Sequence, residues 1–190
     1  MTSTHRALAE IQSTSLKAAR GAGCPWGLAE EAGHATRLLE AHGLPGAKAL
    51  ATLLSSPRAC NCGSGTGAAC GLFDMAGLMD ALPDGPVTVG PVVAPLLLLV
   101  PFFNGQQTWH LTWDGGAAHI GPDGATLVGT TPDHPTEVTA RPVETWPKLS
   151  PPSLSGRMID AEVWTCLEQF AARVYVPETA ASRASGAGPD

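Results

Sequence analysis

The most apolar stretch of the chain runs from Val87 to Phe103, and Asn104-Gly105 follows it directly. An Asn-Gly pair is typical of a type I′ hairpin turn, because both central positions of that turn need a positive φ. Thr108–Trp113 then alternates polar and apolar residues, which indicates a strand with one wetter face. The pattern predicts a hairpin that reverses at Asn104-Gly105. Its first arm, Leu96–Val100, is apolar on both sides and is expected to be the central strand.

Further strands are expected after this hairpin. A turn signal at 114–116 precedes a strand around Ala118 and Ile120, and a second turn signal at 121–124 leads into a strand at 125–129. Glu137–Val143 is predicted as another strand. Together they form an antiparallel meander. A final helix is predicted after the N-cap residue Asp160, with its apolar face packed on the sheet and its end at Pro177.

The N-terminal part of the chain has helical spacing. Helices are expected at about 4–20, 28–42 and 46–54, and a weaker one at 72–82. In the second of these, Glu30 and Glu31 are expected in the first turn, and Glu40 on the polar side. The fold class predicted is α+β, an antiparallel meander with helices packed on one face and an N-terminal helical layer.

The length of 190 residues suits a single domain over 1–190. Within it we expect five parts: a helical layer (1–56), a loop and short helix (57–86), the sheet (87–144), a linker and C-terminal helix (145–177), and a tail (178–190).

Charge and composition narrow the class of partner. Hydrophobic residues make up 44% of the chain and charged residues only 15%, so self-association or a protein partner is expected to cover part of the surface. The net charge is −6 and there is no cluster of basic residues, which argues against nucleic acid and against an anionic membrane surface.

Neither export nor membrane insertion is expected. No apolar segment of the signal-peptide kind follows the N-terminal residues, and four prolines interrupt the uncharged stretch between Asp84 and Asp114. Five cysteines, an odd number, are typical of a reducing compartment rather than of a disulfide framework. The expected location is the cytoplasm.

Three cysteines, Cys60, Cys62 and Cys70, lie close together among glycines. They are the weak candidates for a zinc or thiol site, since zinc prefers four ligands and the C-x-C spacing differs from the usual knuckle. A fourth ligand would come from elsewhere in the chain. The glycines at 63–67 lack the Lys-Ser/Thr pair and the preceding strand of a phosphate-binding loop. No metal or other cofactor is therefore expected, and the three thiols are interpreted as loop residues without a role in binding or catalysis.

Two histidines, His110 and His119, are expected on the wetter face of adjacent strands, in a diagonal relation with His119 beside Thr112. Such a pair is able to share a proton or a metal, but the face offers no third ligand. We expect both histidines to be solvated or packed rather than to bind a ligand.

Several unusual segments lie at opposite ends of the chain: Ala18–Gly23, Trp26–Gly33, Tyr175–Thr179, Ser182-Arg183 and Gly186–Gly188. Together they resemble a bacterial family of unknown function, domain of unknown function 3726. The resemblance implies no activity, and Cys24-Pro25 departs from the plain N-cap residue expected before the second helix.

These segments are also the most unusual polar stretches of the chain. We therefore expect them to meet and to line one pocket that binds, or acts on, a small polar or anionic metabolite. The candidate ligand-binding residues are Trp26, Glu30, Glu31, Tyr175, Ser182 and Arg183. Two alternatives stay open: a non-enzymatic subunit of a larger assembly, and a zinc- or thiol-dependent module at the cysteine loop. No motif assigns a reaction, so no catalytic residue is named.

Overall fold

The computed structural model describes residues 2–56, 69–80, 84–144, 149 and 151–174. It confirms the α+β fold class. The helices are α1 Leu8–Gly21, α2 Trp26–Ala41, α3 Gly46–Ser55, α4 Gly71–Asp80, the 3-10 helix η1 Pro95–Asn104 and α5 Ala161–Ala172. The strands are β1 Ser3–Arg6, β2 Ala69–Cys70, β3 Val87–Val93, β4 Thr108–Trp113, β5 Gly116–Gly121, β6 Gly124–Gly129, β7 Thr136–Val143 and β8 Arg157–Asp160.

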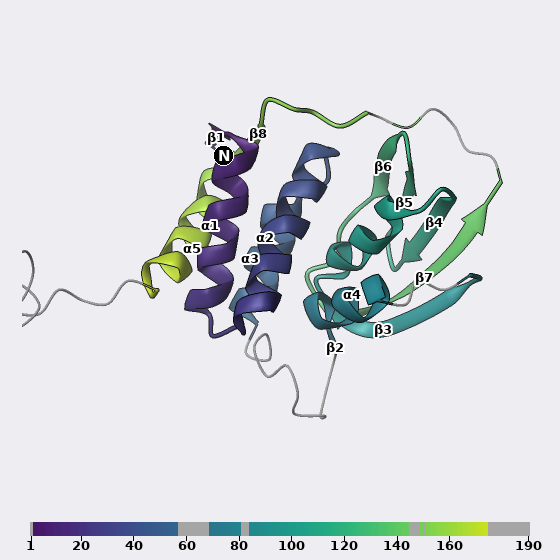
Figure 1. Cartoon of the computed structure of the whole chain (residues 1–190), viewed down its shortest axis with the longest axis horizontal. Coiled ribbons are helices and arrows are strands. Elements are labelled where there is room, and N and C mark those ends of the chain that lie inside the picture. The colour runs from purple at the N-terminus through teal and green to yellow at the C-terminus, as the bar shows by residue number, and fades with distance from the viewer. Residues whose placement is uncertain (1, 57–68, 81–83, 145–148, 150, 175–190) are drawn as a thin grey trace, which may run out of the picture.

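The helical layer consists of α1, α2, α3 and α5, which lie side by side on one side of the molecule (Figure 1). Small residues let these helices approach closely. A Cβ atom on Gly33 of α2 would lie only 2.8 Å from the carbonyl oxygen of Gln12 in α1. β1 and β8 form a two-stranded antiparallel sheet at one end of this layer. The three N-terminal helices expected from the sequence are confirmed, except that the first begins at Leu8 rather than near residue 4, because Ser3–Arg6 forms β1.

The large sheet has the strand order β2-β3-β7-β4-β5-β6. β4, β5 and β6 form a meander, and β7 then returns between β3 and β4, antiparallel to both. The two-residue β2 adds a short parallel edge to β3. Burial alternates along β4 as the sequence pattern predicts, with Trp109, Leu111 and Trp113 buried.

The predicted hairpin at Asn104-Gly105 is wrong. β3 ends at Val93, and Pro95–Asn104 forms η1 instead of a central strand. Gly105 has φ −86°, so the turn geometry that the Asn-Gly pair suggested is absent there. The two strands at the middle of the sheet are β7 and β4.

The physical reason for this difference lies in the residue types within the apolar run. Its first part is rich in the β-branched Val and Thr, which favour strands, whereas 96–99 is four leucines, which favour helix. Ala94 has φ 58° and breaks the strand, and Pro95 then suits the first position of a helix. Apolarity on all sides is as typical of a buried helix as of a central strand.

The C-terminal helix begins as expected but packs elsewhere. The Asp160 carboxylate accepts hydrogen bonds from the backbone N–H groups of Glu162, at 2.9 Å, and Val163, at 3.4 Å. In the described part of the chain, the main contacts of α5 are with α1 and α3. The expectation that α5 covers the sheet is therefore wrong. Its buried residues Trp164 and Leu167 complete the helical layer instead.

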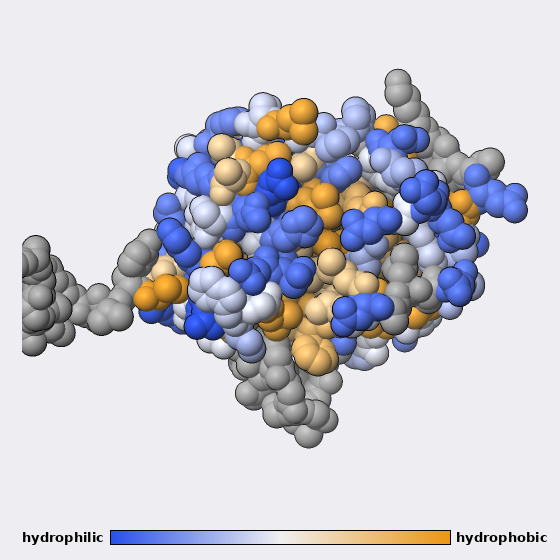
Figure 2. Space-filling model, in the orientation of Figure 1, coloured by the Kyte–Doolittle hydropathy of each residue, from blue (hydrophilic) through white to orange (hydrophobic). Residues whose placement is uncertain are grey.

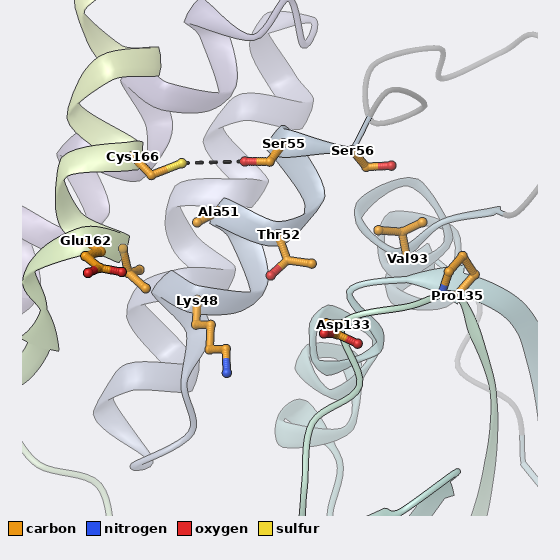
Figure 3. A pocket seen from close by; sticks show the side chains of 11 residues that line it. Lys48, Ala51, Thr52, Ser55, Ser56, Val93, Asp133, Pro135, Glu162 and Cys166 are labelled. Carbon is orange, nitrogen blue, oxygen red and sulfur yellow. Dashed lines mark hydrogen bonds between the residues drawn. The ribbon is translucent and has the colours of Figure 1, made fainter. Parts of the chain in front are cut away.

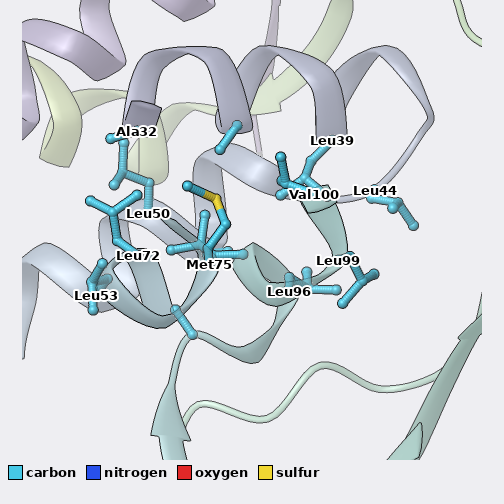
Figure 4. Packing of buried hydrophobic residues seen from close by; sticks show 14 of the residues in the cluster. Ala32, Leu39, Leu44, Leu50, Leu53, Leu72, Met75, Leu96, Leu99 and Val100 are labelled. Atoms are coloured by element: carbon cyan, nitrogen blue, oxygen red, sulfur yellow. The ribbon is translucent and has the colours of Figure 1, made fainter. Parts of the chain in front are cut away.

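η1 and α4 fill the space between the helical layer and the sheet. Side chains of α2, α3, α4 and η1 meet there in one apolar cluster, which includes Leu39, Leu50, Met75 and Leu99 (Figure 4). Figure 2 shows that hydrophobic residues also reach the surface near the middle of one face, between the helices and the sheet. Within the described residues, no helix combines the length and the apolar character needed to cross a membrane.

The burial of η1 leads to a first prediction. Leu97 is fully buried, whereas Leu154 is 90% exposed, so the same substitution has different consequences at the two positions. We expect Leu97→Ala to lower the free energy of unfolding by about 3 kcal/mol, since the variant leaves a cavity. Leu154→Ala is the matched control and should change it by less than about 0.5 kcal/mol. Urea unfolding measures both, and equal small effects would contradict the buried position of η1.

Candidate functional site

Three of the residues predicted to line a pocket lie on α2. Trp26 is the first residue of the helix and is 59% exposed, with the Arg20 guanidinium 5.6 Å from the ring centroid. Glu30 is exposed and Glu31 half-buried. Because α2 begins at Trp26, both glutamates follow its first turn, and their predicted place in that turn is wrong.

The other wall of that predicted pocket lies outside the described residues. Tyr175, Ser182 and Arg183 all belong to 175–190. The meeting of the two chain segments therefore stays a prediction.

The cysteine loop is also mostly outside the described residues, since Cys60 and Cys62 lie in 57–68. Cys70 is half-buried at the end of β2. Among the residues that the structure describes, no three His, Cys, Asp or Glu side chains gather closely enough to hold a metal ion. The zinc or thiol site stays a prediction.

The two histidines of the sheet form a closer pair than expected. His110 of β4 is directly opposite His119 of β5, so the predicted diagonal relation is wrong; Thr112 instead faces Ala117. The two rings are stacked, with centroids 4.2 Å apart and planes at 7°. The reversal around residues 114–115 sets this register, since Trp113 is opposite Gly116.

Burial, with a smaller contribution from nearby charge, keeps this pair neutral. The Arg141 Nε–H donates to His110 Nδ1 at 3.4 Å, so that nitrogen must be unprotonated. Burial lowers the pKa of His119 to about 4, with smaller contributions from His110 and Arg141. Burial and Arg141 also lower the pKa of His110. The pair is a packed polar element of the sheet.

A pocket that the sequence did not predict lies where α2, α3, α5 and β8 meet. Its volume is about 280 Å³. We call it the Glu40 pocket. Its charged and polar lining residues are Ser3, Glu40, Lys48, Arg157 and Asp160.

Glu40 itself is 4% exposed, although its charge suggested the polar side of α2. That expectation is wrong. The residue before α3 is Pro45, which has no side-chain oxygen to cap the helix. The Glu40 carboxylate takes this role, and it accepts a hydrogen bond of 2.9 Å from the backbone N–H of Ala47. Burial outweighs this bond and the nearby Arg157, and it raises the pKa of Glu40 to about 7.

Arg157 of β8 forms the opposite wall of the pocket. Its Nε atom lies 4.0 Å from Glu40 Oε2, which is an ion pair too long to be a hydrogen bond. This buried Nε has no hydrogen-bond partner among the described residues. A Cβ atom on Gly43, which has φ +79°, would lie 3.7 Å from the Arg157 guanidinium. The pocket therefore places a guanidinium, whose Nε–H has no hydrogen-bond partner among the described residues, beside a carboxylate with a pKa of about 7.

A larger open groove adjoins the Glu40 pocket. Its volume is about 580 Å³, and we call it the α3–α5 groove. Figure 3 shows Lys48, Thr52 and Ser55 on α3, with Glu162 and Cys166 on α5 and Asp133 across the groove. The Ser55 hydroxyl lies 3.5 Å from the Cys166 sulfur. Lys48 and Val163 line both the groove and the Glu40 pocket.

The spacing of residues along α2 did indicate that Glu40 is buried. Ala29, Gly33, Thr36 and Glu40 follow one another at intervals of four, three and four residues, and all are buried. This is the stripe of a helix that faces the core. Assigning Glu40 by its charge rather than by this spacing placed it on the wrong side. The pairing with Arg157, which lies on a strand far along the chain, has no counterpart in local sequence.

Comparison with known proteins supports the resemblance at the N-terminal end. The family described as Protein of unknown function (DUF3726) matches residues 6–65, which include α1, α2, α3 and Glu40. Searches of curated proteins and of solved structures gave no match.

The raised pKa of Glu40 leads to a prediction on stability. Folding raises this pKa from about 4.5 to about 7, so its contribution to stability is fully present below pH 4.5 and is lost as the pH rises through 7. At about 1.4 kcal/mol per unit, the shift from 4.5 to about 7 amounts to a loss of about 3 kcal/mol. Glu40→Gln keeps an acceptor for Ala47 but does not titrate. We expect the variant to gain about this amount relative to the wild type between pH 4.5 and 8.

Urea unfolding across this pH range measures the effect. Glu30→Gln is the matched control, because Glu30 is an exposed glutamate on the same helix. An equal pH dependence in Glu40→Gln and in the wild type would contradict the assignment of the titrating group.

The lowered pKa of His119 makes stability depend on pH in the opposite direction. Its stabilising contribution is present above the ordinary value of 6.5 and is lost as the pH falls from 6.5 through about 4. We expect His119→Gln to lose stability less steeply than the wild type over this range. His34→Gln, at an exposed position on α2, should follow the wild type. Thermal unfolding from pH 7 to pH 4 compares the three proteins, and parallel curves would rule out His119 as an acid-sensitive group.

Proposed function

We propose that the protein binds a small metabolite through a carboxylate group in the Glu40 pocket. The observation that carries the proposal is the Arg157 guanidinium, whose buried Nε has no hydrogen-bond partner among the described residues. The Arg157 side chain is 39% exposed, so a ligand in the pocket reaches it, and a planar guanidinium matches the two oxygens of a carboxylate. The volume of about 280 Å³ suits a small ligand.

The backbone and charges around the pocket favour a negative ligand. The first turns of α3 and α5 both border it, and helix N-termini attract negative charge. Lys48 and Arg157 bring two positive charges against the carboxylate of Asp160, which the N–H groups of α5 already engage. A protonated Glu40 therefore leaves the pocket with an excess of one positive charge.

The same residues favour a monoanion over a dianion. Asp160 and, above pH 7, Glu40 repel a second negative charge at close range. A carboxylate fits this balance better than a phosphate group, which carries up to two charges near neutral pH. Because a neutral Glu40 no longer competes for Arg157, the ligand should bind more tightly as the pH falls through about 7.

We propose further that the protein works in the bacterial cytoplasm and associates with itself or with a protein partner. The odd number of cysteines, five, supports a reducing compartment. The low share of charged residues, 15%, supports a surface that is partly covered in an assembly.

The proposal is tested by titrating the full chain with acetate while recording backbone amide chemical shifts. We expect saturable shifts at Gly43, Lys48 and Met158, and binding that is weaker at pH 8 than at pH 6. Arg157→Ala should weaken binding at least tenfold, since a charge-assisted hydrogen bond is lost. Arg173→Ala is the charge-matched control, because Arg173 lies over the Phe170 ring, away from the pocket. Equal binding by both variants, or no saturable shift, would overturn the proposal.

A further inference from the structure

We infer that the ligand is an amphipathic monocarboxylate, with its carboxylate in the Glu40 pocket and its apolar part in the α3–α5 groove. This inference rests on the proposed function and adds the chemical class of the ligand. Its basis is the position of Lys48 and Val163, which line both cavities.

The two helices run from the pocket along the groove. Lys48 lies in the first turn of α3, and Thr52 and Ser55 follow on the same face at intervals of four and three residues. On α5, Val163 lies in the first turn and Cys166 one turn further along. A ligand held at the two helix starts therefore has an open path along both helices. The helix rise makes this path about 10 Å long between Lys48 and Ser55.

The groove walls suit hydrocarbon. Ala51, Val93, Pro135 and Val163 contribute apolar surface, and Thr52 adds a methyl group. An alkyl chain laid against such walls leaves water, and each buried methylene strengthens binding about fourfold. Among the described residues that line the groove there is no Arg side chain, unlike in the Glu40 pocket, to hold a second carboxylate.

The placement of charges along the groove sets the polarity of the ligand. Asp133 lies across the groove from Lys48, and Glu162 lies at the start of α5, so both carboxylates are near the pocket end (Figure 3). At the other end, the described lining residues Ser55, Ser56 and Cys166 carry no cationic group, and a second carboxylate there would lose water without gaining an ion pair. The site therefore selects against dicarboxylates of the same length.

The experiment is a calorimetric titration of the full chain with acetate, butanoate, hexanoate and octanoate at pH 6. We expect affinity to increase about fifteenfold for each added pair of methylenes until the groove is filled. Octanedioate should bind at least tenfold more weakly than octanoate.

A variant that fills the groove separates its contribution from that of the pocket. Ser55→Trp places a large ring at the end of the groove and should lower octanoate affinity about tenfold while acetate binding stays unchanged. Ser13→Trp is the matched control, because Ser13 is an exposed serine on α1. It should bind the whole series as the wild type does.

The outcomes distinguish the two proposals. Affinity that is independent of chain length but still lost in Arg157→Ala would overturn the amphipathic ligand and leave carboxylate binding in place. Affinity that rises with chain length but is unchanged in Arg157→Ala would overturn carboxylate recognition, and with it this inference. Equal binding of octanoate by Ser55→Trp and Ser13→Trp would also overturn the use of the groove.

Discussion

The burial of η1 is the constraint on which the rest of the structure depends. Eight consecutive residues, Pro95–Phe102, are buried, and η1 contacts α2, α3 and α4 on one side and β4, β5 and β7 on the other. A strand at this position would need partners for its backbone on both edges, whereas a helical segment satisfies much of its own backbone. The amide of Leu97, for example, bonds the carbonyl oxygen of Ala94 at 3.1 Å. A helical conformation thus allows η1 to present side chains to both layers.

This arrangement fixes the corner that carries the Glu40 pocket. Leu39 and Leu44 flank Glu40 in the chain and are both buried in the central cluster. Gly46 lies so close to α2 that a Cβ atom there would be 2.8 Å from Leu39 Cβ and from the Thr36 carbonyl oxygen. The α2–α3 corner therefore has little freedom to move, and Glu40 and the start of α3 are held in place by the apolar core. Preorganisation of this kind reduces the entropy lost on binding.

The sequence predicted the elements whose signal is local. The helices at the N-terminus and the cap at Asp160 depend on residues within one or two turns, and they were predicted correctly. Local pattern failed where residue type and tertiary context compete. The leucines at 96–99 suit a buried strand and a buried helix equally by periodicity, and the Asn-Gly pair then favoured the wrong alternative. The pairing of Glu40 with Arg157 joins residues more than one hundred positions apart, and no local pattern encodes it.

The energetics of Glu40 argue that the pocket is more than a structural cap. A serine or aspartate in place of Pro45 would cap α3 locally, without burying a carboxylate from another helix. The chain instead keeps a glutamate whose ionisation opposes folding, since burial outweighs the Ala47 hydrogen bond and the ion pair. Arg157 compensates only partly, because its Nε remains 4.0 Å from the carboxylate. A polar arrangement that lowers stability near neutral pH is typical of a site maintained for binding or chemistry rather than for the fold. The incomplete pairing of Glu40 and Arg157 is therefore the strongest physical argument for placing the proposed ligand in this pocket, against the exposed part of the Arg157 side chain.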